Sequence, residues 1–432
     1  MRWIAKPHAA LRAVVRLTCV ASLGSCTLSR DLDSLTTGSD TGGSSGGGGT
    51  GGAGASGGLG GYDSGAPVPP QSPLQRIAAG GNHACVIDAS KRVFCWGGNQ
   101  FGQLGLPTST TQTSRPTLVP GVTGVSVIAT GNFHTCAFGD AGNWCWGQGA
   151  QGELGDGKLE TSATPVSITL PGIVTLAAAG GSHTCVAAGP TRQVSCWGSN
   201  NGFQSSSTQS PSAVAAPTAT GLTQQFSVAA GGKHTCVAPS AGTARCWGDN
   251  TSGQLGTGTP GDSVTPVDVL LTMDVTQLAS RASHTCAIVK TNTGAGLRCW
   301  GRNDSGQLGN GSVGGQELSP VAVSGGLAPI RVAVGSDHTC AIVTGSAHCW
   351  GSNAKGQLGD GTLEANPTPQ PVSLPASVVA FDVATGTGFT CALTLPQGGS
   401  DPDAIWCWGN NASGQSGALP SNAEPTPVQL QL

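Results

Sequence analysis

Residues 231–256 read GGKHTCVAPSAGTARCWGDNTSGQLG, and this stretch contains the three motifs that decide the fold. His-Thr-Cys opens one apolar segment, Cys-Trp-Gly closes the next, and Asn-x-x-Gly-Gln-Leu-Gly follows. The same motifs, with local substitutions, recur in this order along the chain at intervals of 50 to 58 residues. The tryptophan of the second motif falls at Trp96, Trp146, Trp197, Trp247, Trp300, Trp350 and Trp408. A fixed period of this length indicates an array of one repeated supersecondary unit.

The pattern of one unit predicts a small antiparallel sheet. In the first, the apolar residues 74–79 precede Gly80, and two strands are expected at 84–88 and 92–96. Alternate side chains of the second strand are apolar on both faces, with Val93 on one and Trp96 on the other. Such a strand must be covered on both sides, as happens when sheets pack radially. We therefore expect an all-β chain whose residues 74–432 form a seven-bladed β-propeller.

The last residues of the chain, 426–432, have the pattern of a single strand. They look like one strand of a unit whose continuation lies at the start of the repeat region, and this predicts a shared closing blade. Other departures from the repeat are local: Glu153 replaces Gln, Arg281 replaces Gly, Phe389 replaces His, and residues 200–205 lose the glycine-rich ending. These substitutions affect individual turns and not the ring.

The composition agrees with loop-rich β structure. Of 432 residues, 70 are Gly and only 9% are charged, whereas exposed helices usually need many Lys, Glu and Arg. The formal net charge is −3, and four of the 19 basic residues lie in residues 1–16. The remaining chain has 15 basic and 22 acidic residues, a net charge of −7. Nucleic-acid binding is not expected, because no basic field is available to attract a phosphate backbone.

The first 25 residues have the pattern of a secretory signal peptide. Residues 1–16 carry four positive charges and no negative ones, and the apolar run at 17–25 is too short for a membrane span of about 20 residues. The run ends in Leu23-Gly24-Ser25-Cys26, which resembles the lipobox of bacterial lipoproteins. The resemblance implies that Cys26 is lipidated and becomes the mature N-terminus. The alternative is an ordinary cleavage site beside an incidental cysteine.

Residues 26–73 then form the expected linker. Its Gly and Ser-rich part cannot bury enough apolar surface to offset the entropy of ordering, and it closes in a proline-rich stretch at 67–70. The sequence therefore predicts three parts: a lipoprotein signal peptide at 1–25, a lipid-anchored linker at 26–73 and the propeller at 74–432. We expect an exported protein of the cell envelope, on the outer membrane or the cell surface, attached to the membrane only through the lipid.

The motifs Gly-x-x-His-Thr-Cys-Ala, Cys-Trp-Gly-x-Asn and Gly-Gln-Leu-Gly together resemble the regulator of chromosome condensation repeat across most of the chain. The resemblance implies a seven-bladed propeller. Nuclear members of that family act as guanine-nucleotide exchange factors and bind chromatin. A leader peptide and an acidic mature chain leave exchange activity only as a remote alternative. Bacterial relatives include a secreted inhibitor that binds a hydrolase through one rim of the ring, which implies a protein-binding platform.

Fourteen of the 16 cysteines fall two per unit, 9 to 16 positions apart across one predicted hairpin. In an exported protein this spacing predicts seven disulfides within the blades. The expected pairs are Cys85 with Cys95, Cys136 with Cys145, Cys185 with Cys196, Cys236 with Cys246, Cys286 with Cys299, Cys340 with Cys349 and Cys391 with Cys407. The alternative is fourteen buried free thiols. A metal site is not expected, because the spacing lacks the close Cys pairs of zinc sites.

The repeated histidines predict a structural role. They recur at His83, His134, His183, His234, His284 and His338, and six equivalent histidines around a ring indicate a repeated hydrogen bond between blades, not catalysis. The seven motif tryptophans are expected to pack between blades. No catalytic triad spacing, carboxylate pair or phosphate-binding motif is present, so we expect a non-enzyme without cofactors.

The variable segments after each glycine-rich motif are the expected binding loops. They cover residues 106–117, 156–164, 258–264, 310–318 and 360–366, and they are polar with few aromatic residues. Variable loops on a rigid scaffold are well suited to recognition. The sequence therefore predicts a monomeric, membrane-anchored protein-interaction module that binds an unknown protein. The alternatives are binding of a glycan through the same polar rim and a purely structural role in the envelope.

Overall fold

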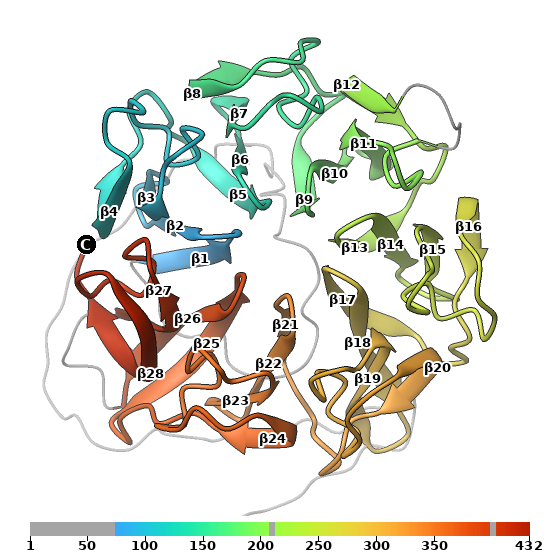
Figure 1. Cartoon of the computed structure of the whole chain (residues 1–432). Helices are drawn as coiled ribbons and strands as arrows, with labels where there is room; N and C mark the ends of the chain where they lie inside the picture. The colour runs from blue at the N-terminus through green and yellow to red at the C-terminus, as the bar shows by residue number, and fades with distance from the viewer. Residues whose placement is uncertain (1–73, 207–211, 398–402) are drawn as a thin grey trace, which may run out of the picture. The chain divides into compact units, whose positions relative to one another are not determined.

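The computed structural model describes residues 74–206, 212–397 and 403–432. The predicted leader, Cys26 and the linker lie outside the described residues. All regular structure in the described part of the chain is β-strand, and it forms seven four-stranded antiparallel sheets. The predicted seven-bladed, all-β propeller is confirmed (Figure 1).

The first four blades occupy residues 74–268. Blade 1 contains β1 (Leu74–Ala79), β2 (His83–Asp88), β3 (Val93–Gly98) and β4 (Gln112–Leu118). Blade 2 contains β5 (Val125–Thr130), β6 (His134–Gly139), β7 (Gly142–Gly147) and β8 (Ser162–Ser167). Blade 3 contains β9 (Val174–Ala179), β10 (His183–Ala188), β11 (Gln193–Ser199) and β12 (Ala213–Ala219). Blade 4 contains β13 (Gln225–Ala230), β14 (His234–Pro239), β15 (Arg245–Gly248) and β16 (Ser263–Asp268).

The last three blades follow the same order. Blade 5 contains β17 (Val275–Arg281), β18 (His284–Thr291), β19 (Gly294–Arg302) and β20 (Gln316–Ala322). Blade 6 contains β21 (Arg331–Val334), β22 (His338–Val343), β23 (Ser346–Gly351) and β24 (Asn366–Pro371). Blade 7 contains β25 (Val378–Thr385), β26 (Phe389–Pro396), β27 (Ala404–Asn411) and β28 (Ser421–Leu430). The first strand of each blade lies nearest the centre of the ring and the fourth lies at its edge (Figure 1).

The expected shared closing blade is wrong. β28 pairs with β27, so the last strand completes the sheet of its own unit, and β1 begins the first sheet. Each unit therefore starts with its innermost strand and ends with its outermost one. The ring closes instead by packing, because β1 lies against β25 and a buried cluster joins blades 7 and 1.

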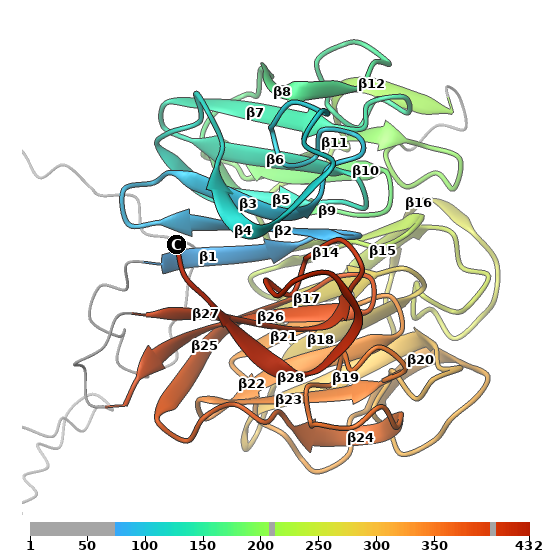
Figure 2. The same cartoon turned by 60° about the vertical axis from the view of Figure 1, so that its left-hand side comes forward.

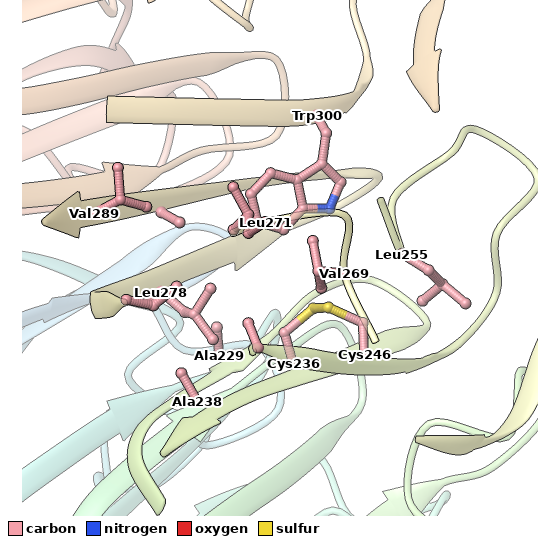
Figure 3. Packing of buried hydrophobic residues seen from close by; sticks show 13 residues of the cluster. Ala229, Cys236, Ala238, Cys246, Leu255, Val269, Leu271, Leu278, Val289 and Trp300 are labelled. Atoms are coloured by element: carbon pink, nitrogen blue, oxygen red, sulfur yellow. A yellow bond between two sulfur atoms is a disulfide. The ribbon is translucent and has the colours of Figure 1, made fainter. Parts of the chain in front are cut away.

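The hydrophobic core lies between neighbouring blades. Between blades 4 and 5, Trp300 packs in one buried cluster with Leu255, Val269 and the Cys236–Cys246 disulfide (Figure 3). The seven motif tryptophans are at most 1% exposed, as expected for packing between blades. Burying an aromatic side chain of this size is among the largest single contributions that one residue makes to a core. The apolar faces of each sheet are thus covered on both sides.

The irregular third unit keeps the geometry of its turn. Phe203 stands where the other units have glycine, such as Gly253, and takes a φ of 64° against 78° for that glycine. A bulky residue in this left-handed region is strained. Gln204 and Ser205 remain buried beside it, so the substitution is accommodated locally.

Candidate binding face

The antiparallel strand order separates the connections of the propeller into two sets. The turns between first and second strands lie at the same end of the ring as the segments between third and fourth strands; we call this end the loop face. The turns cover residues 80–82, 131–133, 180–182, 231–233, 282–283, 335–337 and 386–388. The described segments cover 99–111, 148–161, 200–206, 212, 249–262, 303–315, 352–365 and 412–420.

The opposite end, the hairpin face, carries the turns between second and third strands and the connections from blade to blade. Figure 2 shows the strands from the side, running between the two ends of the ring. Each of the five predicted binding segments begins on the loop face and runs towards or into the fourth strand of its blade. The structure thus gathers these segments on one face.

A repeated turn holds each loop-face segment in place. In blade 4, Asn250 Oδ1 accepts a hydrogen bond from the backbone N–H of Leu255 at 3.0 Å. Gln254 Oε1 accepts one from the backbone N–H of Ser252 at 2.8 Å. Leu255 is fully buried and anchors the turn in the core. The equivalent hydrogen bonds occur in blades 1, 5 and 6, so the motif builds rigid bases for variable tips.

Each of these turns is also bonded to the next blade. The indole N–H of Trp300 donates to the backbone carbonyl of Gln254 in the preceding blade at 2.9 Å. The same bond occurs at all seven junctions, with Trp96 donating to Gln415 across the closure of the ring at 3.0 Å. The predicted packing role of the tryptophans is therefore accompanied by a directional bond. The loop face is a continuous framework and not a set of independent loops.

The repeated histidines bond between blades, as the sequence predicts. The Nε2 of His83 lies 2.9 Å from the hydroxyl of Thr135 in the next blade, and five further junctions have the same pair at 2.8 to 3.0 Å. Thr135 donates its own hydroxyl proton to the carbonyl of Gln103, so His83 must donate from Nε2. The Nδ1 atom of His83 is left without a partner, as it is in four of the other five histidines.

Burial keeps these six histidines neutral. It lowers the pKa of His83, His134, His183, His284 and His338 to about 3, with nearby positive groups as a smaller cause. The pKa of His234 falls to about 4 by burial. The histidines are distributed around the ring, one per junction, and are not brought together. They cannot act as a common acid–base or metal site.

One arginine crosses the centre of the ring. Arg281 ends β17 in blade 5, yet its guanidinium donates to the carbonyl of Ala79 in blade 1 at 3.0 Å and to Oδ1 of Asn132 in blade 2 at 3.3 Å. The side chain is 7% exposed, and burial lowers its pKa to about 10. The sequence showed Arg281 only as a substituted glycine. The structure makes it a cationic link between three blades.

Glu153 is a second buried substitution. It takes the place of the motif glutamine, is fully buried, and accepts the backbone N–H of Gln151 through one carboxyl oxygen at 2.7 Å. Burial raises its pKa. The same hydrogen bond is made by glutamine in the other blades, so the carboxyl group fits the turn without changing it.

The disulfides join the cysteines in the pairs expected from the sequence. In each blade the two cysteines face each other on the second and third strands, for example Cys236 and Cys246 on β14 and β15. All seven bonds have a Cα–Cα separation of 4.1 Å. In the described part of the chain, no group of three His, Cys, Asp or Glu side chains is placed to hold a metal ion.

The structure reveals an aromatic pair that the sequence analysis missed. The rings of Phe101 and Phe133 lie 5.0 Å apart at an angle of 47°, both half-buried on the loop face. Phe101 comes from the outer segment of blade 1 and Phe133 from the inner turn of blade 2. Other blades carry polar residues or glycine at both positions, such as Ser252 and Lys233. Comparing the variable positions of aligned motifs would have exposed the two substitutions.

A polar hollow lies on the same loop face. It has a volume of about 470 Å³ and is lined by inner turns of blades 2 to 5 and by the ends of neighbouring strands. Its polar side chains include Asn132, Ser182, Gln204, Lys233 and Asp249. Such a lining fits a small polar ligand better than an apolar one.

Known proteins share both the repeats and the architecture. A model of the regulator of chromosome condensation (RCC1) repeat matches residues 91–138, 143–187, 242–288, 299–342 and 344–393. A second RCC1 repeat model matches residues 75–103, 227–254 and 275–307. The matches cover more than half of the chain, and the longest stretches of the propeller that they leave out are residues 188–226, mostly in blade 3, and residues 394–432 in blade 7.

Among curated relatives, the ultraviolet-B receptor UVR8 of Arabidopsis thaliana is 29% identical over 247 residues, 55% of this chain and 55% of that protein. The E3 ubiquitin-protein ligase HERC2 of Homo sapiens is 27% identical over 279 residues, 61% of this chain but 6% of that protein. The chain therefore spans about half of the first relative and a small part of the second.

Solved structures agree on the fold. Prp20p of Saccharomyces cerevisiae superposes with a TM-score of 0.67 at 20% identity, covering 75% of this chain and 82% of that one. Human WBSCR16 superposes with a TM-score of 0.65 at 21% identity, covering 74% and 85%. The repeat matches, the seven sheets and these superpositions together place the chain in the regulator of chromosome condensation (RCC1) repeat family.

Proposed function

We propose that this chain is an exported, membrane-anchored protein-interaction module that binds a partner protein through its loop face. The observation that carries the proposal is the pair of Phe101 and Phe133, which lies on a rigid framework at positions that are polar or glycine in other blades. Aromatic side chains are enriched among the residues that dominate binding energy at interfaces. Their fixed position lowers the entropy lost on binding.

Relatives support an interaction role. Prp20p is described for its binding to Gsp1p and histones, and yeast RCC1 (Prp20) has been solved with Kap60 bound. At 20% identity these structures share only the fold with this chain. What they supply is a precedent for a propeller of this type that binds proteins. A non-catalytic platform also agrees with the separation of the six buried histidines around the ring.

Export is supported by the seven disulfides. Disulfides of this density are typical of proteins that fold in oxidising compartments. We further propose the division into a signal peptide at 1–25, a linker at 26–73 and a propeller at 74–432, with lipid on Cys26. The described residues contain no helix long and apolar enough to cross a membrane.

The anchor is tested separately from binding. The full chain, expressed in its host with a fatty-acid probe, should be labelled, and the Cys26→Ala variant should not. Absence of label on the unaltered chain, or label that survives Cys26→Ala, would contradict the anchor and leave the binding proposal in place.

Binding is tested by affinity capture with the oxidised full chain, using envelope extract and secreted proteins of the same host. A partner identified by mass spectrometry should bind saturably, and the double variant F101S/F133S should weaken it by at least about tenfold, as for a hot-spot pair. The matched control is F226S. Phe226 is 38% exposed and lies at the beginning of β13, near the hairpin face, where its ring contacts Arg192. Equal loss with F226S, or no loss with F101S/F133S, would contradict binding through this pair.

The polar hollow favours a second candidate function, binding of a carbohydrate. Its amide, hydroxyl and charged groups suit a polyhydroxyl ligand. A glycan array probed with the full chain would detect it, and the variant S182A/K233A should lose the signal. If the unaltered chain gives no stronger glycan signal than the S182A/K233A variant, this alternative is wrong.

A further inference from the structure

Exposed apolar side chains recur at the outer rim of the loop face. Leu159, Val313 and Leu363 occupy the same position, the fifth residue after the leucine of the glycine-rich motif, in blades 2, 5 and 6. They are 54%, 61% and 53% exposed. Leu419 of blade 7 is 84% exposed in the corresponding segment. Three neighbouring blades, 5 to 7, thus present an apolar tip each, and blade 2 presents a fourth.

Each leucine tip of blades 2 and 6 stands between two carboxylates. The segments read Asp-Gly-Lys-Leu-Glu at 156–160 and Asp-Gly-Thr-Leu-Glu at 360–364. In both, the aspartate accepts the backbone N–H two residues later, at 3.0 Å for Asp156 and 2.9 Å for Asp360, which fixes the turn. Glu160 and Glu364 are exposed, and none of the six ion pairs among the described residues involves these four carboxylates.

The two faces of the propeller differ in charge. Besides buried Glu153, the described turns and segments of the loop face contain eight acidic residues and three lysines. The acidic ones are Asp156, Glu160, Asp249, Asp262, Asp304, Asp337, Asp360 and Glu364, and the lysines are Lys158, Lys233 and Lys355. Arg302, at the end of β19, pairs with two of the aspartates, Asp304 and Asp337. The described turns and connections of the hairpin face are balanced, with three acidic and three basic residues.

We infer that the rim of the loop face docks a protein whose contact surface is basic and has apolar recesses for the exposed leucine and valine tips. The inference rests on the proposed function and specifies its partner. Apolar tips supply burial, while the surrounding carboxylates attract and orient a surface of opposite charge. Anionic lipid surfaces and nucleic acids are repelled by the same carboxylates.

The direction of the first strand agrees with this assignment. β1 enters the propeller at Leu74 and runs from the hairpin face towards the loop face. The N-terminal end of β1 therefore lies at the hairpin face, away from the acidic rim segments.

The inference is tested with two rim variants of the full chain, E160K/E364K for charge and L159S/L363S for the tips. Their matched controls on the hairpin face are D140K/D274K and I173S/I330S, since Ile173 and Ile330 are 68% and 45% exposed there. The probe is the envelope protein of the host, divided at pH 7 into the fraction retained by a cation-exchange resin and the fraction that flows through. Circular dichroism and thermal unfolding verify that all variants fold.

The expected result is a saturable partner from the retained, basic fraction. Both rim variants should weaken it by about tenfold or more, both controls by less than about twofold, and added salt should weaken it progressively. A partner found only in the flow-through, or one unaffected by the rim variants, overturns the inference while the proposed function stands. The absence of any saturable protein partner in both fractions overturns the proposed function and the inference together.

Discussion

Phe389 and Ala84 lie in one buried cluster at the junction of blades 7 and 1, where the other six junctions have a histidine bonded to a threonine. The position of Phe389 is that of the histidine, and the position of Ala84 is that of its partner threonine in the next blade. Both members of the polar pair are thus replaced at the one place where the chain closes its ring. Neither replacement leaves a buried group without its partner.

The closing junction predicts that the histidine and threonine of another junction can be replaced by apolar residues only when both are replaced together. T390A alone should destabilise the full chain by about 1–3 kcal/mol, because it leaves the buried Nε2–H of His338 without a hydrogen-bond acceptor. The double variant H338F/T390A copies the closing junction and should lose less than T390A. Urea unfolding of the oxidised proteins measures both free energies of unfolding. A double variant at least as unstable as T390A would contradict the argument.

The buried histidines predict that acid destabilises the propeller. Their pKa values in the folded chain are about 3, or about 4 for His234, and near 6.5 when unfolded. Below pH 6.5 the unfolded state therefore binds more protons, so the free energy of unfolding is highest above pH 6.5 and falls from there towards pH 3. At pH 5 each histidine should reduce it by about 2 kcal/mol relative to pH 7.5.

Denaturant unfolding at both pH values measures this loss, and H338F/T390A is the internal control. Lacking one of the six histidines, it should lose about 2 kcal/mol less than the unaltered chain between pH 7.5 and pH 5. An identical pH dependence for the two proteins would show that His338 is not neutral in the folded state or stays uncharged when unfolded.

Each disulfide should contribute measurably to stability. The Cys340–Cys349 bond closes a loop of nine residues, for which the chain-entropy model gives about 2.5 kcal/mol. The variant C340A/C349A should lose about that much, measured by urea unfolding without reductant. The unaltered chain, produced in an oxidising compartment, should show no free thiol at the fourteen blade cysteines when unfolded. Detection of about fourteen reactive thiols would instead mean that the cysteines are reduced.

Arg281 should stabilise the ring through its length and its forked guanidinium. R281M removes the bonds to Ala79 and Asn132 while keeping much of the side-chain volume, and should cost about 1–3 kcal/mol. R281K should recover little, because an ammonium group is a compact point charge without the planar fork. Thermal unfolding compares the three proteins, and full stability in R281K would show that charge alone is sufficient.

Local repetition explains why much of the fold was predictable. Each sheet is built from one contiguous unit, and its cysteines, histidine and tryptophan recur at positions that alternate along short strands. The disulfide partners are only 9 to 16 residues apart, so their pairing follows from one hairpin. The one topological error, the shared closing blade, arose at residues 426–432. Similar Thr-Pro segments end other units, as at Thr265-Pro266, and show that β28 simply ends blade 7.

The site was predictable only in part. The rim segments were identified as polar and variable, but the sequence analysis gave neither Phe101 and Phe133 as a pair nor the charge difference between the two faces. The two phenylalanines belong to different blades and meet because neighbouring sheets pack side by side. The net charge of the whole chain likewise does not show that the loop face is acidic while the hairpin face has equal numbers of acidic and basic residues.

The sequence by itself determined the repeat, the strand pattern, the disulfide partners and the residues that face each inter-blade core, because all of these depend on spacing within about 50 residues. Only the tertiary structure decided what ring closure brings together. Trp96 bonds to Gln415, 319 residues away, and Arg281 reaches Ala79 across the centre. Closure is cooperative packing of all seven sheets, so both contacts depend on the whole ring. The Trp96 bond repeats a pattern of the other junctions, whereas the Arg281 contact joins blades that are not neighbours and leaves no local pattern in the chain.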